Sequence, residues 1–243
     1  MKMSASEAVL NVIAESGTDV VFGYPGSAVA PVYDALFSFD KIKHVLTRTE
    51  QSAAHAASGY AKESGKTGVC IATSGPGATN LITGIATAMS DSVPMVAITG
   101  QVDSSLLGSD AFQEADITGA AEPFTKHSYI VKRTADIPRI FKEAFHIAST
   151  GRPGPVLIDV PIDMQQHTLS HFTYDEPVDI IGYKPRVQGH SLQIRKAVEA
   201  LASCKRPVLC AGGGVFSAGP AAMPPAGARG YPSCSSSSFH MAS

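Results

Sequence analysis

Glu50 is the acidic residue whose place in the sequence is most compatible with chemistry. It follows the short apolar run Val45-Leu46-Thr47 and opens an alanine-rich stretch that continues to Ser64. A carboxyl group in partly apolar surroundings can hold or transfer a proton. The plainer interpretation is an acid in the first turn of a helix, stabilising it by about 0.3–1 kcal/mol through the helix dipole. Position alone favours the plainer interpretation, since first-turn acids are common.

Two glycine-rich turns could form a ligand site with this acid. They are Gly23-Tyr24-Pro25-Gly26-Ser27 and Ser74-Gly75-Pro76-Gly77-Ala78-Thr79-Asn80, and each lies between an apolar run and a helical pattern. Glycine allows a tight turn and a close approach of the backbone to a ligand. Neither turn has the GxGxxG spacing of a dinucleotide site, and either alone is equally typical of an ordinary strand-to-helix turn. Parallel sheets bind ligands at the carboxyl ends of their strands, so two such turns together favour a site there.

The composition excludes several classes of protein. The chain has 243 residues with 19 basic and 21 acidic side chains, 7% aromatic residues and no tryptophan, which does not indicate nucleic-acid binding. No apolar run approaches the roughly 20 residues of a membrane-spanning helix. Eight scattered histidines and four cysteines without CxxC spacing predict no metal site. Without a secretory or transit signal in the sequence, we expect a cytoplasmic protein with no membrane partner.

Apolar runs and helical patterns alternate along the first two thirds of the chain. Ser4 and Glu7 form a capping box that opens a helix, and Gly17 is placed to end it. Continuously apolar strands separated by helices predict an α/β domain with a doubly wound parallel sheet. We expect strands at 20–24, 45–47, 68–72, 94–99 and 155–161, and further helices at 29–39, 50–64, 77–90 and 136–149, with 101–126 irregular.

The pattern changes after this domain, which we assign to residues 1–164. Residues 165–190 are polar and contain several Pro and Gly, as is typical of a linker. A helix at 191–202 and a strand at 207–211 indicate the start of a second α/β domain over 191–215. Residues 216–243 contain no Val, Ile or Leu and one charged residue, so we expect a low-complexity, disordered tail. This abrupt change in composition suggests that the coding sequence is truncated or read in a shifted frame.

Several longer strings resemble one enzyme family. Gly23-Tyr24-Pro25-Gly26, Glu50-Gln51 and Gly59-Tyr60-Ala61 occur in the order of the pyrimidine-binding domain of thiamine-diphosphate enzymes. The strings 67–81, 110–116 and 151–155 narrow the resemblance to the large, catalytic subunits of acetohydroxyacid (acetolactate) synthases. The resemblance covers about residues 4–215. It implies that 1–164 is the pyrimidine-binding domain and that Gly212-Gly213-Gly214 belongs to the start of the FAD-associated middle domain.

The resemblance implies a reaction and a role for Glu50. Pyruvate is decarboxylated on thiamine diphosphate, and the two-carbon fragment is joined to a second 2-oxo acid in branched-chain amino-acid biosynthesis. Glu50 matches the glutamate that hydrogen-bonds N1′ of the aminopyrimidine and so promotes removal of the proton from C2 of the thiazolium. Loss of such a proton relay commonly lowers the rate by about 10²–10⁴.

The resemblance also assigns the other candidate site residues. The cofactor-binding set, for thiamine diphosphate or FAD, is Gly26, Ser27, Pro76, Asn80 and Arg152, of which Arg152 is the FAD contact. The substrate-side set is Ala28, Phe112, Gln113 and Lys126.

Four positions depart from the family pattern. Ser27 replaces a glycine, Thr49 replaces the histidine before the glutamate, and Ser58 replaces an acidic or small residue. Ile162 replaces a lysine on the substrate side, which removes a positive charge. These changes leave the efficiency with 2-oxo acids open.

The family has parts that we do not find in this sequence. The Mg²⁺ and diphosphate motif belongs to a third domain, and a complete site forms between two subunits. We therefore expect a fragment that is inactive alone and that associates as a homodimer or tetramer, with a small regulatory subunit as a further partner. The alternatives are a related thiamine-diphosphate enzyme, of the pyruvate oxidase or glyoxylate carboligase type, or a non-catalytic assembly domain.

Overall fold

The protein divides into two compact units, residues 1–185 and 186–243. The computed structural model describes residues 3–175, 177–206, 209–218 and 233–235. No helix within these residues is both long enough and apolar enough to cross a membrane.

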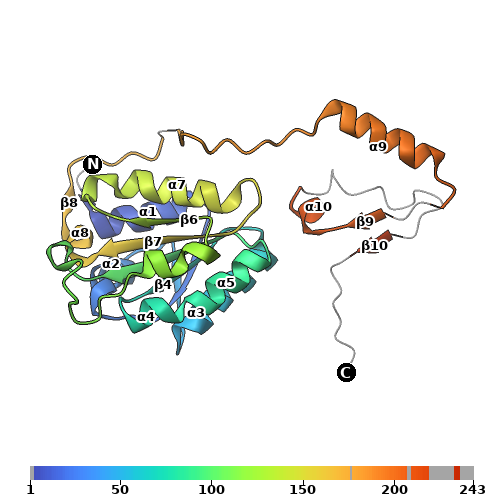
Figure 1. Ribbon diagram of the computed structural model, residues 1–243. Helices are drawn as coiled ribbons and strands as arrows, with labels where there is room; N and C mark the ends of the chain where they lie inside the picture. Colours follow the sequence, from blue (N-terminus) through green and yellow to red (C-terminus); the bar gives the residue numbers. More distant parts are fainter. Residues whose placement is uncertain (1–2, 176, 207–208, 219–232, 236–243) are drawn as a thin grey trace, which may run out of the picture. The chain divides into compact units, whose positions relative to one another are not determined.

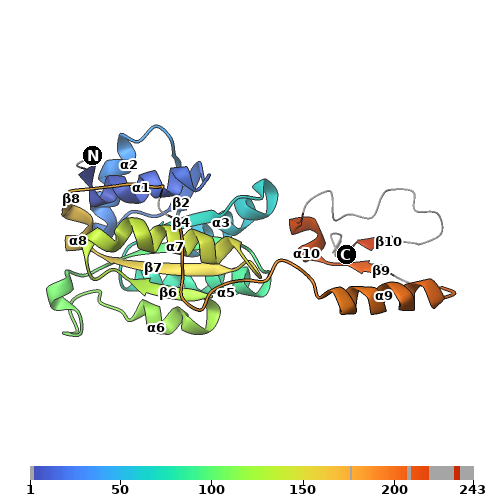
Figure 2. The same cartoon turned by 90° about the horizontal axis from the view of Figure 1, so that it is seen from above.

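A six-stranded parallel sheet forms the centre of the first unit (Figure 1). Its strand order is β3-β2-β4-β5-β7-β6, which confirms the predicted doubly wound α/β fold. The strands are β2 (Val20–Gly23), β3 (Lys43–Leu46), β4 (Gly68–Ala72), β5 (Met95–Gln101), β6 (His127–Ile130) and β7 (Pro155–Pro161). The prediction missed β6, whose sequence His-Ser-Tyr-Ile is half polar because the strand lies at the edge of the sheet beside β7 (Figure 2).

Helices cover both faces of this sheet. One buried cluster contains residues from α1 (Ala5–Glu15), α2 (Ala30–Phe37) and α7 (Ile137–Ser149). The other contains residues from α3 (Glu50–Ser64), α4 (Pro76–Asn80), α5 (Ile82–Ser90) and α6 (Ile117–Ala121). Successive residues of a strand point to opposite faces, so Val69 and Ile71 lie in the first cluster while Cys70 and Ala72 lie in the second. Figure 1 shows the two helical layers on either side of the strands.

Helix α3 packs closely on its neighbours because the contacting residues are small. A Cβ atom on Gly68 of β4 would lie 2.2 Å from the carbonyl oxygen of Ala57. A Cβ atom on Gly84 of α5 would lie 2.3 Å from the Cβ atom of Ala54. Buried alanines of α3 therefore pack directly on glycines, and this contact fixes the position of the helix that begins at Glu50.

The local signals for helix ends mostly agree with the structure. Ser4 and Glu7 form the predicted capping box, and Gly17 has a φ of 88°. Helix α3 occupies the predicted 50–64 and ends at Gly65, which has a φ of 71°. The expected helix at 77–90 is instead two helices, α4 and α5, that meet at Leu81.

The described residues of 165–185 belong to the first unit, although we expected a linker over 165–190. Helix α8 (Ile162–Gln166) follows β7, and β8 (Thr168–Leu169) pairs with β1 (Met3–Ser4). Tyr174 and Tyr183 are partly buried against the first hydrophobic cluster. These aromatic side chains anchor an otherwise polar segment to the domain. The linker was predicted from the polar composition of 165–190, which gives no indication of this anchoring.

The second unit contains α9 (Ser191–Ser203), β9 (Leu209–Ala211), α10 (Gly213–Ser217) and β10 (Ser233–Ser235). The helix predicted at 191–202 is confirmed, and β9 pairs in parallel with β10. Most of the segment predicted to be a disordered tail, namely 219–232 and 236–243, lies outside the described residues, as do 207 and 208 of the predicted strand.

Candidate active site

The chain changes direction in the sheet at β2, and this determines where a site can form. Strand β3 pairs with one side of β2, and the chain then crosses back so that β4 pairs with the other side. The loops that leave β2 and β4 therefore diverge at the carboxyl edge of the sheet. Such a topological switch point is where open α/β sheets bind ligands. Both glycine-rich turns lie at this point.

Glu50 faces the second of these turns. Thr49 caps helix α3 by accepting a hydrogen bond from the amide of Ser52 at 3.2 Å, which fixes the first turn. Glu50 Oε2 accepts a hydrogen bond from Asn80 Nδ2 at 3.0 Å. The carboxylate is half-buried, and a Cβ atom on Gly77 would lie 3.3 Å from Oε1. The predicted acid, Asn80 and the backbone of the glycine-rich turn are therefore brought together.

One oxygen of this carboxylate remains available. Within the part of the chain that the structure describes, no donor reaches Glu50 Oε1. The side of Oε1 toward Gly77 is bounded by backbone alone, and a larger residue there would also lie 2.7 Å from Thr73 Cγ2. A free carboxyl oxygen that can carry a proton, beside a side-chain-free turn, can donate a hydrogen bond to the ring nitrogen of an aminopyrimidine. The residues around Glu50 therefore fit the aminopyrimidine end of thiamine diphosphate.

The first glycine-rich turn packs against the second through Thr73. A Cβ atom on Gly26 would lie 2.5 Å from the Cβ atom of Thr73, and the amide of Ala28 donates to Thr73 Oγ1 at 3.3 Å. Ser27 is exposed and begins a short 3-10 helix, Ser27–Val29. Sequence reasoning did not single out Thr73, although a hydroxyl between β4 and a glycine-rich turn is a usable signal. Pro76 stands at the start of α4 in the same turn.

A third segment reaches the site from the loop after β5. The carbonyl oxygen of Gln113 would lie 2.8 Å from a Cβ atom on Gly75, whose own φ is 58°. Gln113 is therefore placed against the Ser74–Asn80 turn. Phe112 beside it is 88% exposed and touches nothing that buries it. The predicted pair thus lies at the edge of the site, with the phenyl ring directed to solvent.

Tyr33 is a residue of this region that the sequence analysis did not assign. A Cβ atom on Gly23 would lie 2.2 Å from its hydroxyl oxygen, so only glycine fits at the end of β2. The hydroxyl is buried and has no hydrogen-bond partner among the described residues, and burial raises the pKa of Tyr33. Its ring packs edge-on against His44 at a centroid distance of 5.0 Å. Tyr33 in turn lines an open hollow of about 760 Å³ with seven others: Pro25, Gly26, Ser27, Ala30, Pro31, Asp34 and Gln166.

Arg152 and Lys126 lie at the opposite edge of the sheet from Glu50. Both precede the amino end of a strand, β7 and β6 respectively. Arg152 Nε donates to Ser92 Oγ at 2.8 Å and Nη2 to the carbonyl of Met89 at 3.1 Å, so it caps the end of α5. Lys126 Nζ donates to the carbonyl of Thr150 at 2.7 Å and to the hydroxyl of Tyr183 at 2.9 Å. The structure does not bring these two residues together with the Glu50 site within one chain.

The positions that depart from the family pattern have local roles. Thr49 is the N-cap of α3, which a threonine hydroxyl suits well. Ser58 is buried within α3. Ile162 begins α8 and is followed by Asp163, whose carboxylate accepts from the amide of Ser104 at 3.0 Å and its hydroxyl at 2.6 Å. No group of three potential metal ligands occurs among the residues described by the structure.

Comparisons with known proteins agree with this geometry. Residues 3–120 match the family described as "Thiamine pyrophosphate enzyme, N-terminal TPP binding domain". The chain is 55% identical over 217 residues to the acetolactate synthase large subunit of Corynebacterium glutamicum, covering 89% of this chain and 34% of that protein. It is 53% identical over 215 residues to the acetolactate synthase large subunit IlvB1 of Mycobacterium tuberculosis, covering 88% of this chain and 35% of that protein.

An archaeal relative extends the similarity. The probable acetolactate synthase large subunit of Methanocaldococcus jannaschii is 52% identical over 219 residues, covering 89% of this chain and 37% of that protein. The chain thus spans about a third of the length of the curated relatives it matches. The two glycine-rich turns and Glu50 all lie in the matched region, so over residues 3–120 the chain is similar to the N-terminal domain of thiamine pyrophosphate enzymes, and over most of its length it is similar to acetolactate synthase large subunits.

Proposed function

We propose that this chain supplies the aminopyrimidine half of the active site of an acetolactate synthase large subunit. The reaction decarboxylates pyruvate and joins the two-carbon fragment to a second 2-oxo acid. The observation that carries the proposal is the Glu50 carboxylate, which is tied to Asn80 by Oε2 and leaves Oε1 free beside Gly77. The identity of 52–55% to proteins of that name supports the choice of reaction.

Glu50 serves to hold a proton at a fixed atom. Asn80 occupies Oε2 as a hydrogen-bond donor, so the proton that Glu50 shares with a ligand resides on Oε1. When bound, thiamine diphosphate supplies the acidic thiazolium carbon on which 2-oxo acids react. The half-buried position of Glu50 and the alanines behind it limit the water that competes for the carboxyl.

The remaining site residues contribute shape. Gly26 and Ala28 are held on Thr73, and Gln113 is held on Gly75, so the two turns and the loop after β5 form one surface. We assign Gly26, Ser27, Pro76 and Asn80 to the cofactor side of this surface, and Ala28, Phe112 and Gln113 to the substrate side. Lys126 is engaged with carbonyl groups at the other edge of the sheet, and any substrate role for it requires a second subunit.

FAD and Mg²⁺ are part of the proposal because they are typical of acetolactate synthases. Arg152 is exposed, which leaves it accessible to a flavin. The family resemblance places the Mg²⁺ site in a third domain.

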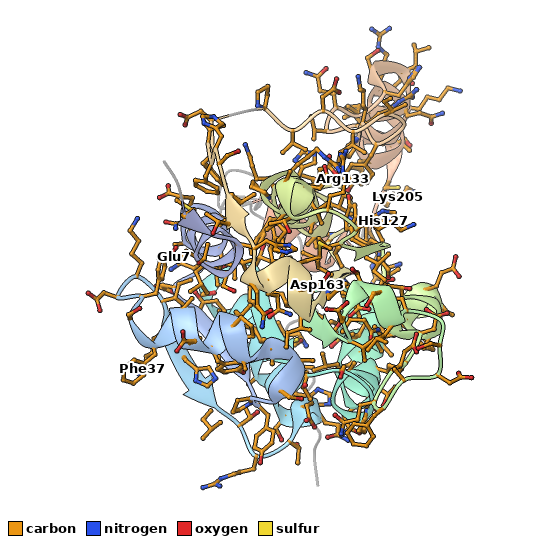
Figure 3. All side chains as sticks on the ribbon, turned by 90° about the vertical axis from the view of Figure 1, so that its left-hand side faces the viewer. Glu7, Phe37, His127, Arg133, Asp163 and Lys205 are labelled. Atoms are coloured by element: carbon orange, nitrogen blue, oxygen red, sulfur yellow. The ribbon has the colours of Figure 1, made fainter. Side chains whose placement is uncertain are left out.

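We further propose that the first unit associates with other subunits as part of a homodimer or tetramer, with a small regulatory subunit as an additional partner. Large apolar side chains are exposed on it, including Phe37 at 95% and Leu46 at 55%, and Figure 3 shows Phe37 projecting from the surface.

The proposed compartment is the cytoplasm. Cys70 and Cys204 are free thiols, which is typical of the cytoplasm.

A chimera tests the proposed function. Residues 3–185 of this chain replace the corresponding part of the Corynebacterium glutamicum large subunit, and formation of 2-acetolactate from pyruvate is measured with thiamine diphosphate, Mg²⁺ and FAD. We expect acetolactate synthesis by the parent chimera and a loss of about 10²–10⁴ in kcat on Glu50→Gln. Glu63→Gln is the matched control, because Glu63 is exposed near the other end of the same helix. Acetolactate formation unaffected by Glu50→Gln would contradict the proposal. Tartronate semialdehyde formed when glyoxylate replaces pyruvate, or acetate formed from pyruvate when an electron acceptor is added, would favour the related enzymes.

A further inference from the structure

Asp159 is a carboxyl group buried in the middle of the sheet. It lies in β7 among the apolar residues Val156, Ile158 and Val160, and is 1% exposed. Its Oδ1 accepts a hydrogen bond from Thr99 Oγ1 at 2.7 Å, and its Oδ2 accepts one from Gln101 Nε2 at 2.9 Å. Burial of a carboxyl group is costly unless its hydrogen bonds are made, so both partners on β5 are required. Neither partner belongs to the Glu50 site.

Gln101 connects this carboxyl to the loop after β5. The same Nε2 that donates to Asp159 also donates to the carbonyl oxygen of Ala115 at 2.9 Å. Gln101 Oε1 accepts the amide of Val102 at 2.9 Å, so each polar atom of the side-chain amide has a partner. Because the two hydrogens of an amide NH₂ group point in fixed directions, an acceptor at Asp159 orients the other hydrogen toward Ala115.

The loop 102–116 is held at both ends and braced within. At its start, Ser104 is bound by Asp163, which is labelled on α8 in Figure 3. Within it, the carboxylate of Glu114 accepts the amides of Gly108 and Ala111, and these bonds lower the pKa of Glu114. At its end, Gln101 binds Ala115. The loop is therefore braced internally and tethered at both ends.

Gln113 lies two residues before the second tether. Its φ is 59°, a left-handed conformation that is unfavourable for a residue with a long side chain. Such a conformation persists only where surrounding contacts enforce it. A hydrogen bond from the amide of Glu114 to the carbonyl of Ala111 at 2.9 Å closes a turn over Gln113. The contact of Gln113 with Gly75 and the bond from Gln101 to Ala115 hold this turn from outside the loop.

We propose that Asp159 and Gln101 are positioning residues that fix the end of the 102–116 loop, and with it Gln113, against the Ser74–Asn80 turn. Asp159 orients the amide of Gln101, Gln101 binds Ala115, and the turn that receives Gln113 also carries Asn80, the partner of Glu50. The fixing of the loop does not depend on the chemistry at Glu50. The contribution of the fixed loop to catalysis rests on the proposed function.

Thr99 provides a matched control, because it binds the same carboxyl from the same strand but does not reach the loop. In the 243-residue chain, Gln101→Met and Thr99→Val each remove one hydrogen bond to Asp159. Hydrogen–deuterium exchange is followed in peptides covering 108–117, with peptides from 137–149 of α7 as the reference. We expect Gln101→Met to accelerate exchange in the loop about 10- to 100-fold, and Thr99→Val to leave it near the parent rate. The conservative Asp159→Asn, which keeps an acceptor for Gln101, is expected to restrain the loop like the parent.

Equal acceleration of the loop by Gln101→Met and Thr99→Val would overturn the proposal, as would no acceleration by Gln101→Met. If α7 also loses protection in Gln101→Met, the variant is unfolded, and Gln101→Asn replaces it. An asparagine side chain is too short to reach Asp159 and Ala115 together, so Gln101→Asn must also release the loop while α7 stays protected. Loop protection retained in a folded Gln101→Asn chain would equally refute the inference. Exchange needs no cofactor or turnover, so this result is separate from the success or failure of the acetolactate synthase proposal.

Discussion

Replacing Asp159 by asparagine should change how the stability of the protein depends on pH. Burial raises the pKa of Asp159 to about 7 from an ordinary value of 3.8, and hydrogen bonds from Thr99 and Gln101 offset only part of this. The folded chain therefore retains a proton on Asp159 between about pH 4 and pH 7, where the unfolded chain has lost it. The free energy of unfolding should decrease as the pH rises through this window.

The size of the effect follows from the difference in pKa. About three pH units at 1.4 kcal/mol each give a loss of roughly 4 kcal/mol between pH 4 and pH 7. The side-chain amide introduced by Asp159→Asn cannot ionise and still offers an acceptor to Gln101, so this substitution should remove the slope. The free energy of unfolding of the variant minus that of the parent should therefore increase from pH 4 to pH 7. Above pH 7 this difference should become constant. Subtracting variant from parent cancels the contributions of other groups, such as His44, whose pKa is lowered by burial.

Urea unfolding at pH 5, 6, 7 and 8 measures this difference. The chain has no tryptophan, so circular dichroism in the far ultraviolet is the suitable signal. Asp136→Asn is the control with the opposite sign, because the hydrogen bond from Arg133 lowers the pKa of Asp136. The contribution of Asp136 is present above its ordinary pKa and is lost only at lower pH. The difference in stability between the parent and Asp136→Asn should therefore be constant from pH 5 to 8. A parent and an Asp159→Asn chain with the same slope between pH 5 and 7 would refute the reasoning.

Two further predictions concern how α3 is positioned. Gly84→Ala should destabilise the protein by about 1–3 kcal/mol in urea unfolding, because the new Cβ atom would lie 2.3 Å from the Cβ atom of Ala54. Gly59→Ala, in α3 where nothing lies within 4 Å, should instead stabilise it by about 0.5–1 kcal/mol, and destabilisation by both would argue against close packing as the cause. Thr49→Ala removes the cap of α3 and should cost about 1 kcal/mol in thermal unfolding, whereas Thr49→Ser should be nearly neutral. Equal losses for Thr49→Ala and Thr49→Ser would show that the hydroxyl cap is not what matters.

The parts of the fold that follow from local physics were predictable from sequence. The strands at 68–72 and 155–161 are continuous apolar runs because they are buried on both faces, and their predicted bounds match β4 and β7. The bounds of α3 follow from a capping threonine and a glycine able to adopt positive φ. Strand β6 was missed because its stability comes from pairing with β7 and not from an apolar sequence.

The site was predictable to a lesser degree. The spacing of Glu50 and the glycine-rich turns indicated a site at the carboxyl edge. Taken alone, Glu50 was better explained as an ordinary first-turn acid, and each turn was equally compatible with an ordinary strand-to-helix turn. The hydrogen bond between Asn80 and Glu50 joins residues 30 positions apart, and no local pattern encodes it. The roles of Tyr33 and Asp159 depend on what surrounds them in three dimensions, since burial decides both. Lys126 and Arg152, in turn, are placed by strand direction at the edge remote from Glu50.

The central claim is that Glu50 acts on thiamine diphosphate through one free carboxyl oxygen. The most direct test is the rate at which the C2 proton of bound thiamine diphosphate exchanges with deuterium in the chimera, read by acid quench and proton NMR. The account predicts exchange about 10²–10⁴ slower for Glu50→Gln than for the parent, with Glu63→Gln unchanged. Equal exchange rates in the parent and in Glu50→Gln, with the cofactor bound in both, would contradict it.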